Sequence, residues 1–593
     1  MSCDKLVFDL SQEIEGSPNV FVKKDWLNIL DNQNTNYNAN QSVIDTSQLS
    51  NSNKYMSYRE AYLAMPLILT VASANATASI LAADFAPSVA ATSADYAVGL
   101  KSWFGQMIHS FTLDYNGTTI IQQTPYINMW NSFKLITSMS MADVITQGAS
   151  IGFYPDDPLS WSFQSAASAS GMGVCNNTNP STSGNSAATT GFFNRYKSGA
   201  GNIGFLNRQM FINYDIDGIP LDATYGNAGA VSITAGAAQL LWKSYIFNKR
   251  PAVAATSQGS IQFAILATVH LKHIHSFFQM CPLLKGVFMK MTMNLNNTST
   301  SFTRSAGSTS ISLVSVSNAV GGVNPLMIAS SLANNGGVAA FGGTLGTATS
   351  FIANVSVGPR CLDQTLNSFG AVVVAPSPLA QSIYLYVPAY TFNPVFEQSY
   401  LSSPIKQIKY SDVYQYQVSN VTAGGQFNNL LTNGIANIKS VLLLPFYSVI
   451  TAANTGLPLG IPVFQSPFDP AGTGCTSPLA LLTNFNVVVS GQNAIYNTQR
   501  YNFEQFNNQL YGVNAVNGGM TDGLTSSLIN ELGFEMEYCY YYVDVSRMLP
   551  VEESVPKSIQ IVGTNASARA LDLWCFVEYG VEVSIDILTG ARV

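Results

Sequence analysis

The sequence predicts an all-β fold of the sandwich or barrel class, because its clearest patterns are alternating strands and tight turns. Residues 108–115 alternate up to Asn116-Gly117, a pair favoured in two-residue hairpin turns, and residues 118–122 return as the partner strand. Apolar side chains occupy the odd positions from 571 to 587, which predicts one long strand with one buried face. Gly580 lies within this run, and we expect a bend or bulge there.

A short helix followed by an alternating strand is predicted twice. Residues 271–278 have helical spacing and precede an alternating strand over residues 287–295. Residues 524–529 precede a second predicted strand over residues 534–545. The chain therefore contains short inserted helices among many strands.

The composition excludes several classes of protein. Only 10% of the 593 residues are charged, against about 25% in average soluble proteins. The 26 Lys and Arg residues, with a net charge of -7, leave little from which to build a basic face, so direct nucleic-acid binding is not expected. The hydrophobic fraction of 47% argues against disorder. Asn, Ser, Thr and Gln take the place of the missing charges.

The N-terminal half also contains segments that do not look like core. The first ten residues lack a basic region followed by an apolar run, so we expect no secretory signal. Residues 61–83 are uncharged but contain Pro66 and several polar residues, which argues against a spanning helix. Residues 1–54 look like an arm, because the Asn-rich stretch at 32–40 has too little apolar content to pack alone. Residues 160–202 and 296–350 are predicted to be long loops.

Histidine and cysteine offer few candidates for chemistry. His270, His273 and His275 are three of only four histidines, and they could bind a metal or simply pack on a helix. Since His273 and His275 are two apart in a predicted helix, they do not face the same way, and we favour packing. The seven cysteines are scattered without a C-x-x-C pair, so we expect free, mostly buried thiols in a reducing compartment.

Three acidic or aromatic patterns are further candidates for a functional site. Asp215-Ile216-Asp217-Gly218 resembles the start of a calcium loop but lacks the later acids, so a solvated turn is favoured. Glu535 and Glu537 share a predicted strand face, whereas glycosidase acids usually come from different strands. The Tyr-rich run 538–542 could stack on carbohydrate, but packing or an interface is favoured. We therefore predict no catalytic, cofactor-binding or metal-binding residue, no cofactor and no enzymatic activity.

Several blocks follow one another in order along the chain, among them IHSFTLDYNGTTIIQQTP, LKHIHSFFQMCPLLKGVFMKMTMNLN, LYVPAYTFNPVFEQSYLS and LDLWCFVEYG. These and the related blocks span residues 108–125, 133–140, 151–157, 271–296, 385–402, 408–418, 430–446, 482–493, 501–512, 555–565 and 571–580. Together they resemble the double jelly-roll major capsid proteins of polinton-like viruses and virophages.

The resemblance implies two tandem eight-stranded jelly rolls with short inserted helices and long loops. The first would cover residues 55–403, with insertions at 160–260 and 300–375, and the second residues 404–593. The two helix-then-strand units would be equivalent features of the two rolls. Residues 300–375 would form a loop at the outer end, and the arm would lie on the inner side.

The function implied by the resemblance is assembly. Three chains would form a pseudo-hexameric capsomer, and capsomers would tile an icosahedral shell with penton and minor capsid proteins as further partners. The protein would be located in the virion and assembled inside the host cell without secretion. The alternative is a glycan-binding β-sandwich of the fibre or adhesin type, which would carry a secretory signal and paired cysteines. A β-sandwich glycoside hydrolase would need an acid pair from separate strands.

Overall fold

The computed structural model is mostly β-sheet. It describes residues 19–33, 37, 39–50, 52–73, 96–156, 208–210, 260–304, 311–330, 350–358, 382–448, 462–467, 472, 474–477, 480–496, 501–510, 528–536, 538–546, 548, 555–587 and 591–592. None of the helices in these ranges is long and apolar enough to cross a membrane.

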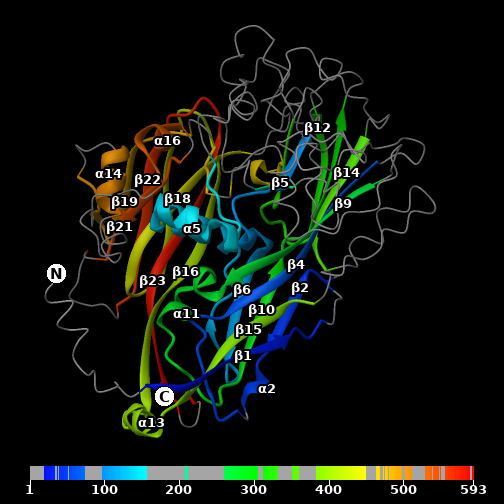
Figure 1. Cartoon of the computed structure of the whole chain (residues 1–593). Coiled ribbons are helices and arrows are strands. Elements are labelled where there is room, and N and C mark those ends of the chain that lie inside the picture. Colours follow the sequence, from blue (N-terminus) through cyan, green and yellow to red (C-terminus); the bar gives the residue numbers. More distant parts are fainter. Residues whose placement is uncertain are drawn as a thin grey trace, which may run out of the picture.

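The first sandwich packs two sheets built from residues of the N-terminal two thirds of the chain (Figure 1). Its larger sheet contains β1 (Phe21–Leu30), β15 (Tyr384–Phe392), β4 (Tyr62–Ser73) and β9 (Ser260–His270), paired in that order. Its smaller sheet has the order β2 (Gln41–Asp45), β10 (Met289–Leu295), β6 (Ile108–Tyr115) and β7 (Thr118–Ile121).

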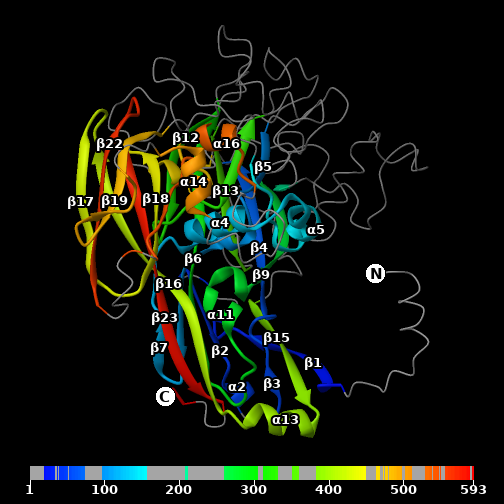
Figure 2. The same ribbon diagram turned by 90° about the vertical axis from the view of Figure 1, so that its left-hand side faces the viewer.

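The second sandwich lies beside the first and consists of two four-stranded sheets (Figures 1 and 2). One sheet has the order β16 (Ile405–Val421), β23 (Leu571–Asp586), β18 (Ile438–Tyr447) and β21 (Tyr541–Asp544). The other has the order β17 (Gln426–Ile435), β22 (Lys557–Asn565), β19 (Leu482–Val489) and β20 (Gln492–Asn493).

The two sandwiches share one topology. When the eight strands named for each are numbered in chain order, one sheet reads 1-8-3-6 and the other 2-7-4-5 in both. This arrangement of two interleaved Greek keys is the jelly roll. The predicted all-β class is confirmed, and the chain folds as two tandem jelly rolls. We call the 1-8-3-6 sheet of each sandwich its main sheet.

The first sandwich also carries extra strands. β14 (Ser350–Val357) pairs with the far half of β4, and β11 (Thr298–Arg304) and β12 (Ile311–Asn318) extend the sheet beyond it. β13 (Leu326–Ser330), β5 (Tyr96–Leu100) and β8 (Gln209–Met210) form a separate small sheet, and β3 (Tyr55–Met56) pairs with β15. The loop expected over residues 300–375 is therefore wrong for its described part, which is largely strand.

The arm expected over residues 1–54 is also wrong for residues 21–45. β1 pairs with β15 along its length, and β2 pairs with β10, so both are integral strands of the first sandwich. The Asn-rich stretch 32–40 lies between the two strands, and β1 is an edge strand whose outward side chains are mostly exposed, so the hydrophobic pattern here is weak. Edge strands show weaker hydrophobic patterns than central ones.

Short helices occupy the connections between strands. In the first sandwich, α4 (Ile127–Ser138) and α5 (Met141–Ile151) lie between strands five and six, and α10 (Leu271–Ile274) and α11 (Ser276–Met280) lie between strands six and seven. In the second sandwich, α14 (Phe503–Gln509) and α16 (Glu531–Met536) lie between strands five and six. The remaining helical segments are α2 (Ser47–Ser50), η1 (Phe104–Met107), η7 (Val463–Gln465) and α13 (Pro394–Leu401), which precedes β16.

The two predicted helix-then-strand units are therefore not equivalent. The first lies between strands six and seven, whereas the second lies between strands five and six. Residues 524–527 lie outside the described residues, and the start of the second predicted strand is helical, as α16 ends at Met536. The topological counterparts of α14 and α16 are α4 and α5, two helices that the strand-based interpretation missed.

The clearest local predictions are confirmed. β6 and β7 form the predicted hairpin, and Asn116 (φ 45°) and Gly117 (φ 80°) both have the positive φ that its type I′ turn requires. β10 alternates between buried methionines and more exposed polar residues, as its period of two predicts.

The long C-terminal strand differs from its prediction in two ways. β23 keeps an unbroken register with β16 through Gly580, and the irregularity lies instead on β18, between Ile438 and Ser440. Its first half is buried on both faces rather than on one, because its odd residues enter the core of the second sandwich while Trp574 and Phe576 contact the first. β23 is thus a shared wall between the two sandwiches.

Candidate functional site at the interface of the two sandwiches

Helix α4 of the first sandwich, labelled in Figure 2, packs its aromatic side chains on the main sheet of the second. The Phe133 ring, which is fully buried, lies 5.2 Å from the Tyr540 ring and 5.5 Å from the Tyr542 ring. Trp130 lies 6.1 Å from Phe576 between ring centroids. These stacked, tilted and edge-on ring pairs contribute beyond their buried area, so they hold the two sandwiches as one block.

The chain reaches this geometry through strong local signals. Ser140 and Asp143 form a capping box, in which the Ser140 hydroxyl accepts from the Asp143 N–H and the Asp143 carboxylate accepts from the Ser140 N–H. Gly152 ends α5 in the left-handed conformation. The Ser-x-x-Asp spacing followed by this glycine was the sequence signal that could have revealed α5.

The side chains of the Tyr-rich run, which leads into β21, alternate between two cores. Tyr538, Tyr540 and Tyr542 pack at the interface between the sandwiches, and Cys539 and Tyr541 pack in the core of the second sandwich. The Tyr538 hydroxyl donates to the carbonyl of Asp156 at 2.5 Å, across the interface. Packing, which was favoured over carbohydrate stacking, is therefore the observed role.

Uncharged groups make most of the polar contacts across the interface. The Ser276 hydroxyl donates to the Ser411 carbonyl at 2.6 Å, and the Thr124 hydroxyl donates to the Val413 carbonyl at 2.6 Å. The Tyr410 hydroxyl donates to the carbonyl of Ile120 at 2.5 Å. Because these bonds satisfy buried backbone carbonyls, they avoid the cost of desolvating charges.

His275 and Asp412 form a buried pair at the same interface. The Nδ1 atom of His275 accepts from the Phe277 N–H at 3.2 Å, so in the neutral ring Nε2 carries the proton and donates to Asp412 Oδ1 at 3.3 Å. Asp412 Oδ1 also accepts from its neighbouring backbone N–H, that of Val413. The pair ties α11 to β16 and is structural in this geometry.

Glu578 on β23 is a carboxylate enclosed at this interface. It is only 8% exposed, its Oε2 accepts from the Ser440 hydroxyl at 2.6 Å, and its Oε1 lies 4.0 Å from Lys134 Nζ. Burial alone raises its pKa, but Lys134, Lys439 and the hydroxyls of Ser440 and Ser411 outweigh burial, so the pKa lies below its ordinary value. Glu578 therefore stays charged at neutral pH.

The corresponding main sheet of the first sandwich presents an exposed aromatic face, which we define as Trp26, Tyr62, Leu266, Tyr384 and Tyr386. Trp26 is 50% exposed and Leu266 is 38% exposed. The Tyr62 ring stacks on Tyr386 at 5.0 Å and lies 5.7 Å from Trp26. Tyr384 and Tyr386 lie on β15, which is strand eight of the first sandwich. They correspond to Trp574 and Phe576 on β23, which is strand eight of the second.

The remaining candidate residues are dispersed. His270 and His273 lie 6.0 Å apart between ring centroids, away from the pairing of His275 with Asp412, and the described residues contain no group of three metal-ligating side chains. Glu535 is in helix α16 rather than on a strand, while Glu537 and the stretch 215–218 lie outside the described residues. Cys281, Cys475, Cys539 and Cys575 are buried thiols. The other three cysteines lie outside the described residues.

With two jelly rolls packed side by side, the chain has the architecture of a double jelly-roll protein. No family model and no curated protein matches the sequence. Over nearly its whole length the fold is similar to solved viral proteins. A chain of the Sputnik virophage has a TM-score of 0.49 and 12% identity over 98% of this chain and 90% of that one.

Two named major capsid proteins give similar alignments. The mavirus major capsid protein has a TM-score of 0.40 and 11% identity over 99% of this chain and 92% of its own. The faustovirus major capsid protein has a TM-score of 0.39 and 11% identity over 98% of this chain and 94% of its own.

Proposed function

We propose that the chain is a major capsid protein that assembles as a closed homotrimer of six jelly rolls. This proposal rests on a difference in how the outer faces of the two main sheets are covered. One is covered by helices of the other sandwich in the same chain, while its counterpart leaves the aromatic face exposed. Exposed apolar patches of this kind usually mark interaction surfaces.

The partner of the aromatic face would be a second copy of this chain. Within the chain, α4 from the connection between strands five and six covers the next main sheet. The second sandwich has its own helices in that connection, α14 and α16, and Leu532 on α16 is 51% exposed. Docking them on the aromatic face of another copy would repeat the intrachain contact between chains.

A contact of this type is head-to-tail, and it closes only if the rotation per copy fits a ring. With two similar sandwiches per chain, three copies would give six nearly equivalent positions, which is a pseudo-hexagonal tile. Such tiles would cover an icosahedral shell, with penton and minor capsid proteins as partners. The protein would then reside in the virion, assemble inside the host cell, and act without catalysis, a cofactor or direct nucleic-acid binding.

The boundary between the two rolls is proposed at residues 403–404. The first sandwich ends with β15 and α13, and the second begins with β16 at Ile405. The expected first domain of 55–403 would extend toward the N-terminus to include β1 and β2, because both strands belong to its sheets.

Light scattering after size exclusion tests the trimer. We expect the wild-type protein to elute at three times the chain mass and Trp26→Glu to shift toward monomer, because a charge in the docked face would be desolvated. Val395→Glu is the matched control, since Val395 is 73% exposed on α13, away from that face. A monomeric wild type, or a Trp26→Glu variant as trimeric as the control, would refute the proposed interface. Negative-stain microscopy should show threefold tiles.

A further inference from the structure

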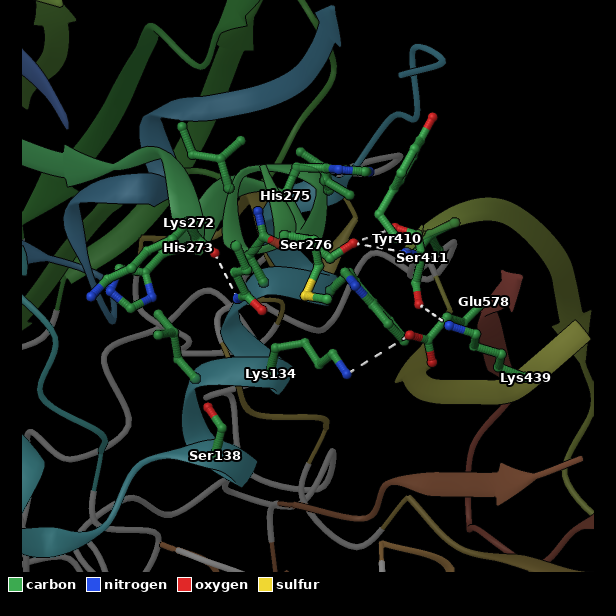
Figure 3. A pocket seen from close by; sticks show the side chains of 18 of the residues that line it. Lys134, Ser138, Lys272, His273, His275, Ser276, Tyr410, Ser411, Lys439 and Glu578 are labelled. Carbon is green, nitrogen blue, oxygen red and sulfur yellow. Dashed lines mark hydrogen bonds and ion pairs between the residues drawn. The ribbon is translucent and has the colours of Figure 1, made fainter. Parts of the chain in front are cut away.

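A pocket of about 350 Å³ opens at the interface between the two sandwiches (Figure 3). Its walls come from α4, α10 and α11 of the first sandwich and from β16, β18 and β23 of the second. This volume lies at the lower end of the range for small-molecule sites. The pocket is thus large enough for a ligand of several heavy atoms.

The pocket is strongly basic in a chain that is otherwise acidic. Lys134, Lys272, Lys409 and Lys439 line it together with one acid, Glu578, so the lining has a formal charge of +3 with histidine neutral. The whole chain has only 26 Lys and Arg residues and a net charge of -7. Four lysines from four different elements therefore line a pocket that contains one carboxylate.

Glu578 balances only part of this charge. Its approach to Lys134 is long, at 4.0 Å, and its other oxygen accepts from Ser440. Lys439 Nζ donates to the Ser411 hydroxyl at 2.9 Å. Glu578 therefore acts on Lys134 and Lys439, and the other two lysines have different surroundings.

Lys409 and Lys272 stand apart from Glu578. Lys409 pairs with Glu582 at 3.5 Å, where both side chains are exposed. Lys272 makes no ion pair with any residue that the structure describes. Figure 3 shows Lys272 and His273 on one side of the pocket, Lys439 and Glu578 on the other, and Lys134 between them.

His273, next to Lys272 in the pocket lining, has a lowered pKa. Burial lowers the pKa of His273 to about 3, and Lys272 and His270 add to the effect. His273 is therefore neutral at physiological pH and adds no positive charge, but its ring can donate one hydrogen bond to a ligand.

We propose that this pocket binds a small multivalent oxyanion, with lysines of both sandwiches contributing to one site. Ammonium groups bind phosphate and carboxylate oxygens as point charges, and partial burial strengthens the attraction relative to water. The apolar edge formed by Trp130, Leu135 and Met280 would accommodate the carbon skeleton of an organic anion. Because Lys134 and Lys272 belong to the first sandwich and Lys409 and Lys439 to the second, a bound anion links the two.

Calorimetric titration of the full-length protein with pyrophosphate and with citrate, at ionic strength held constant with KCl, tests this site. We expect saturable binding of at least one probe, and the comparison tells a phosphate-bearing ligand from a carboxylate-bearing one. The double variant Lys272→Gln/Lys409→Gln should bind at least tenfold more weakly. It leaves Lys134 and Lys439 in place beside Glu578, so the buried carboxylate keeps its compensation.

Lys290→Gln is the matched control, because Lys290 is exposed on β10. It should bind as the wild type does. Binding at pH 7 should also shift the NMR resonances of the His273 ring protons, since the anion lies beside Lys272. The proposal is overturned if neither probe binds, if the double variant binds as tightly as the Lys290→Gln control, or if the His273 resonances stay unmoved when a probe saturates the protein.

Discussion

Replacing Phe133 by alanine measures how strongly α4 couples the two sandwiches. The side chain is fully buried between the rings of Tyr540 and Tyr542, and deleting a buried phenylalanine typically costs about 3–5 kcal/mol. The lost ring–ring contacts, worth about 0.5–1.5 kcal/mol each, favour the upper part of that range. We therefore expect a loss near 4 kcal/mol in the free energy of unfolding.

The shift in melting temperature then reports the size of the cooperative unit. At roughly 2.1 cal/mol/K per residue, unfolding the about 350 described residues together has an entropy near 0.7 kcal/mol/K, so about 4 kcal/mol lowers Tm by about 5 °C. If only the second sandwich unfolds in the transition, with about 130 described residues between Ile405 and Asp586, the same loss lowers Tm by about 14 °C. Rigid coupling through α4 predicts the smaller value and a single transition.

Scanning calorimetry of wild type, Phe133→Ala, Phe133→Leu and Val395→Ala is the assay. Phe133→Leu should fall between wild type and alanine, and Val395→Ala, at a position 73% exposed, should stay within about 0.5 kcal/mol of wild type. A Phe133→Ala variant that melts within 1 °C of wild type would refute the view that this helix holds the sandwiches together.

Three further outcomes are expected. Gly117→Ala should lower the free energy of unfolding by about 1–2 kcal/mol through its positive φ alone, since a Cβ there meets nothing within 4 Å. Gly434 is equally open but has no positive φ, so Gly434→Ala should cause no such loss. The denaturant midpoints of the two variants make the comparison. Because the folded pKa of Glu578 is lowered, its contribution is present above its ordinary pKa and lost as pH falls below it, so Glu578→Gln should flatten the pH dependence of Tm below about pH 4.5. Burial lowers the pKa of His109 to about 4, so wild type should lose stability as pH falls from about 6.5 toward 4, and His109→Gln should lose less over that window.

The local sequence determined the strands more clearly than it determined the interface. Period-two alternation and the Asn116-Gly117 turn depend on neighbouring residues, so β6, β7 and β10 could be predicted from the residues alone. β1 could not be predicted in this way. Its partner β15 lies more than 350 residues away, and its polar and aromatic outward residues give it no clear alternation of apolar and polar residues.

The candidate site was harder to predict for the same reason. The even positions of β23 looked like a solvent face because they include Asp572, Glu578 and Glu582. Trp574 and Phe576 at those positions indicate burial only when another sandwich is known to lie against them. The pocket lysines come from residues 134, 272, 409 and 439, and only the fold brings them together.

The low charge of the chain follows from this architecture. A strand such as β23, buried on both faces over residues 571–578, cannot alternate charged residues with apolar ones as a half-exposed strand does. Where polar groups are needed between the sandwiches, Ser276, Thr124 and Tyr410 bond backbone carbonyls at a lower desolvation cost than an ion pair. If the aromatic face is covered by another copy in the same way, part of the first main sheet is also removed from water. A chain that buries sheet faces twice, within its sandwiches and between them, has few positions left where a charge is stable. Four lysines around one pocket are an exception, and the proposed oxyanion would add to the partial compensation that Glu578 and Glu582 give them.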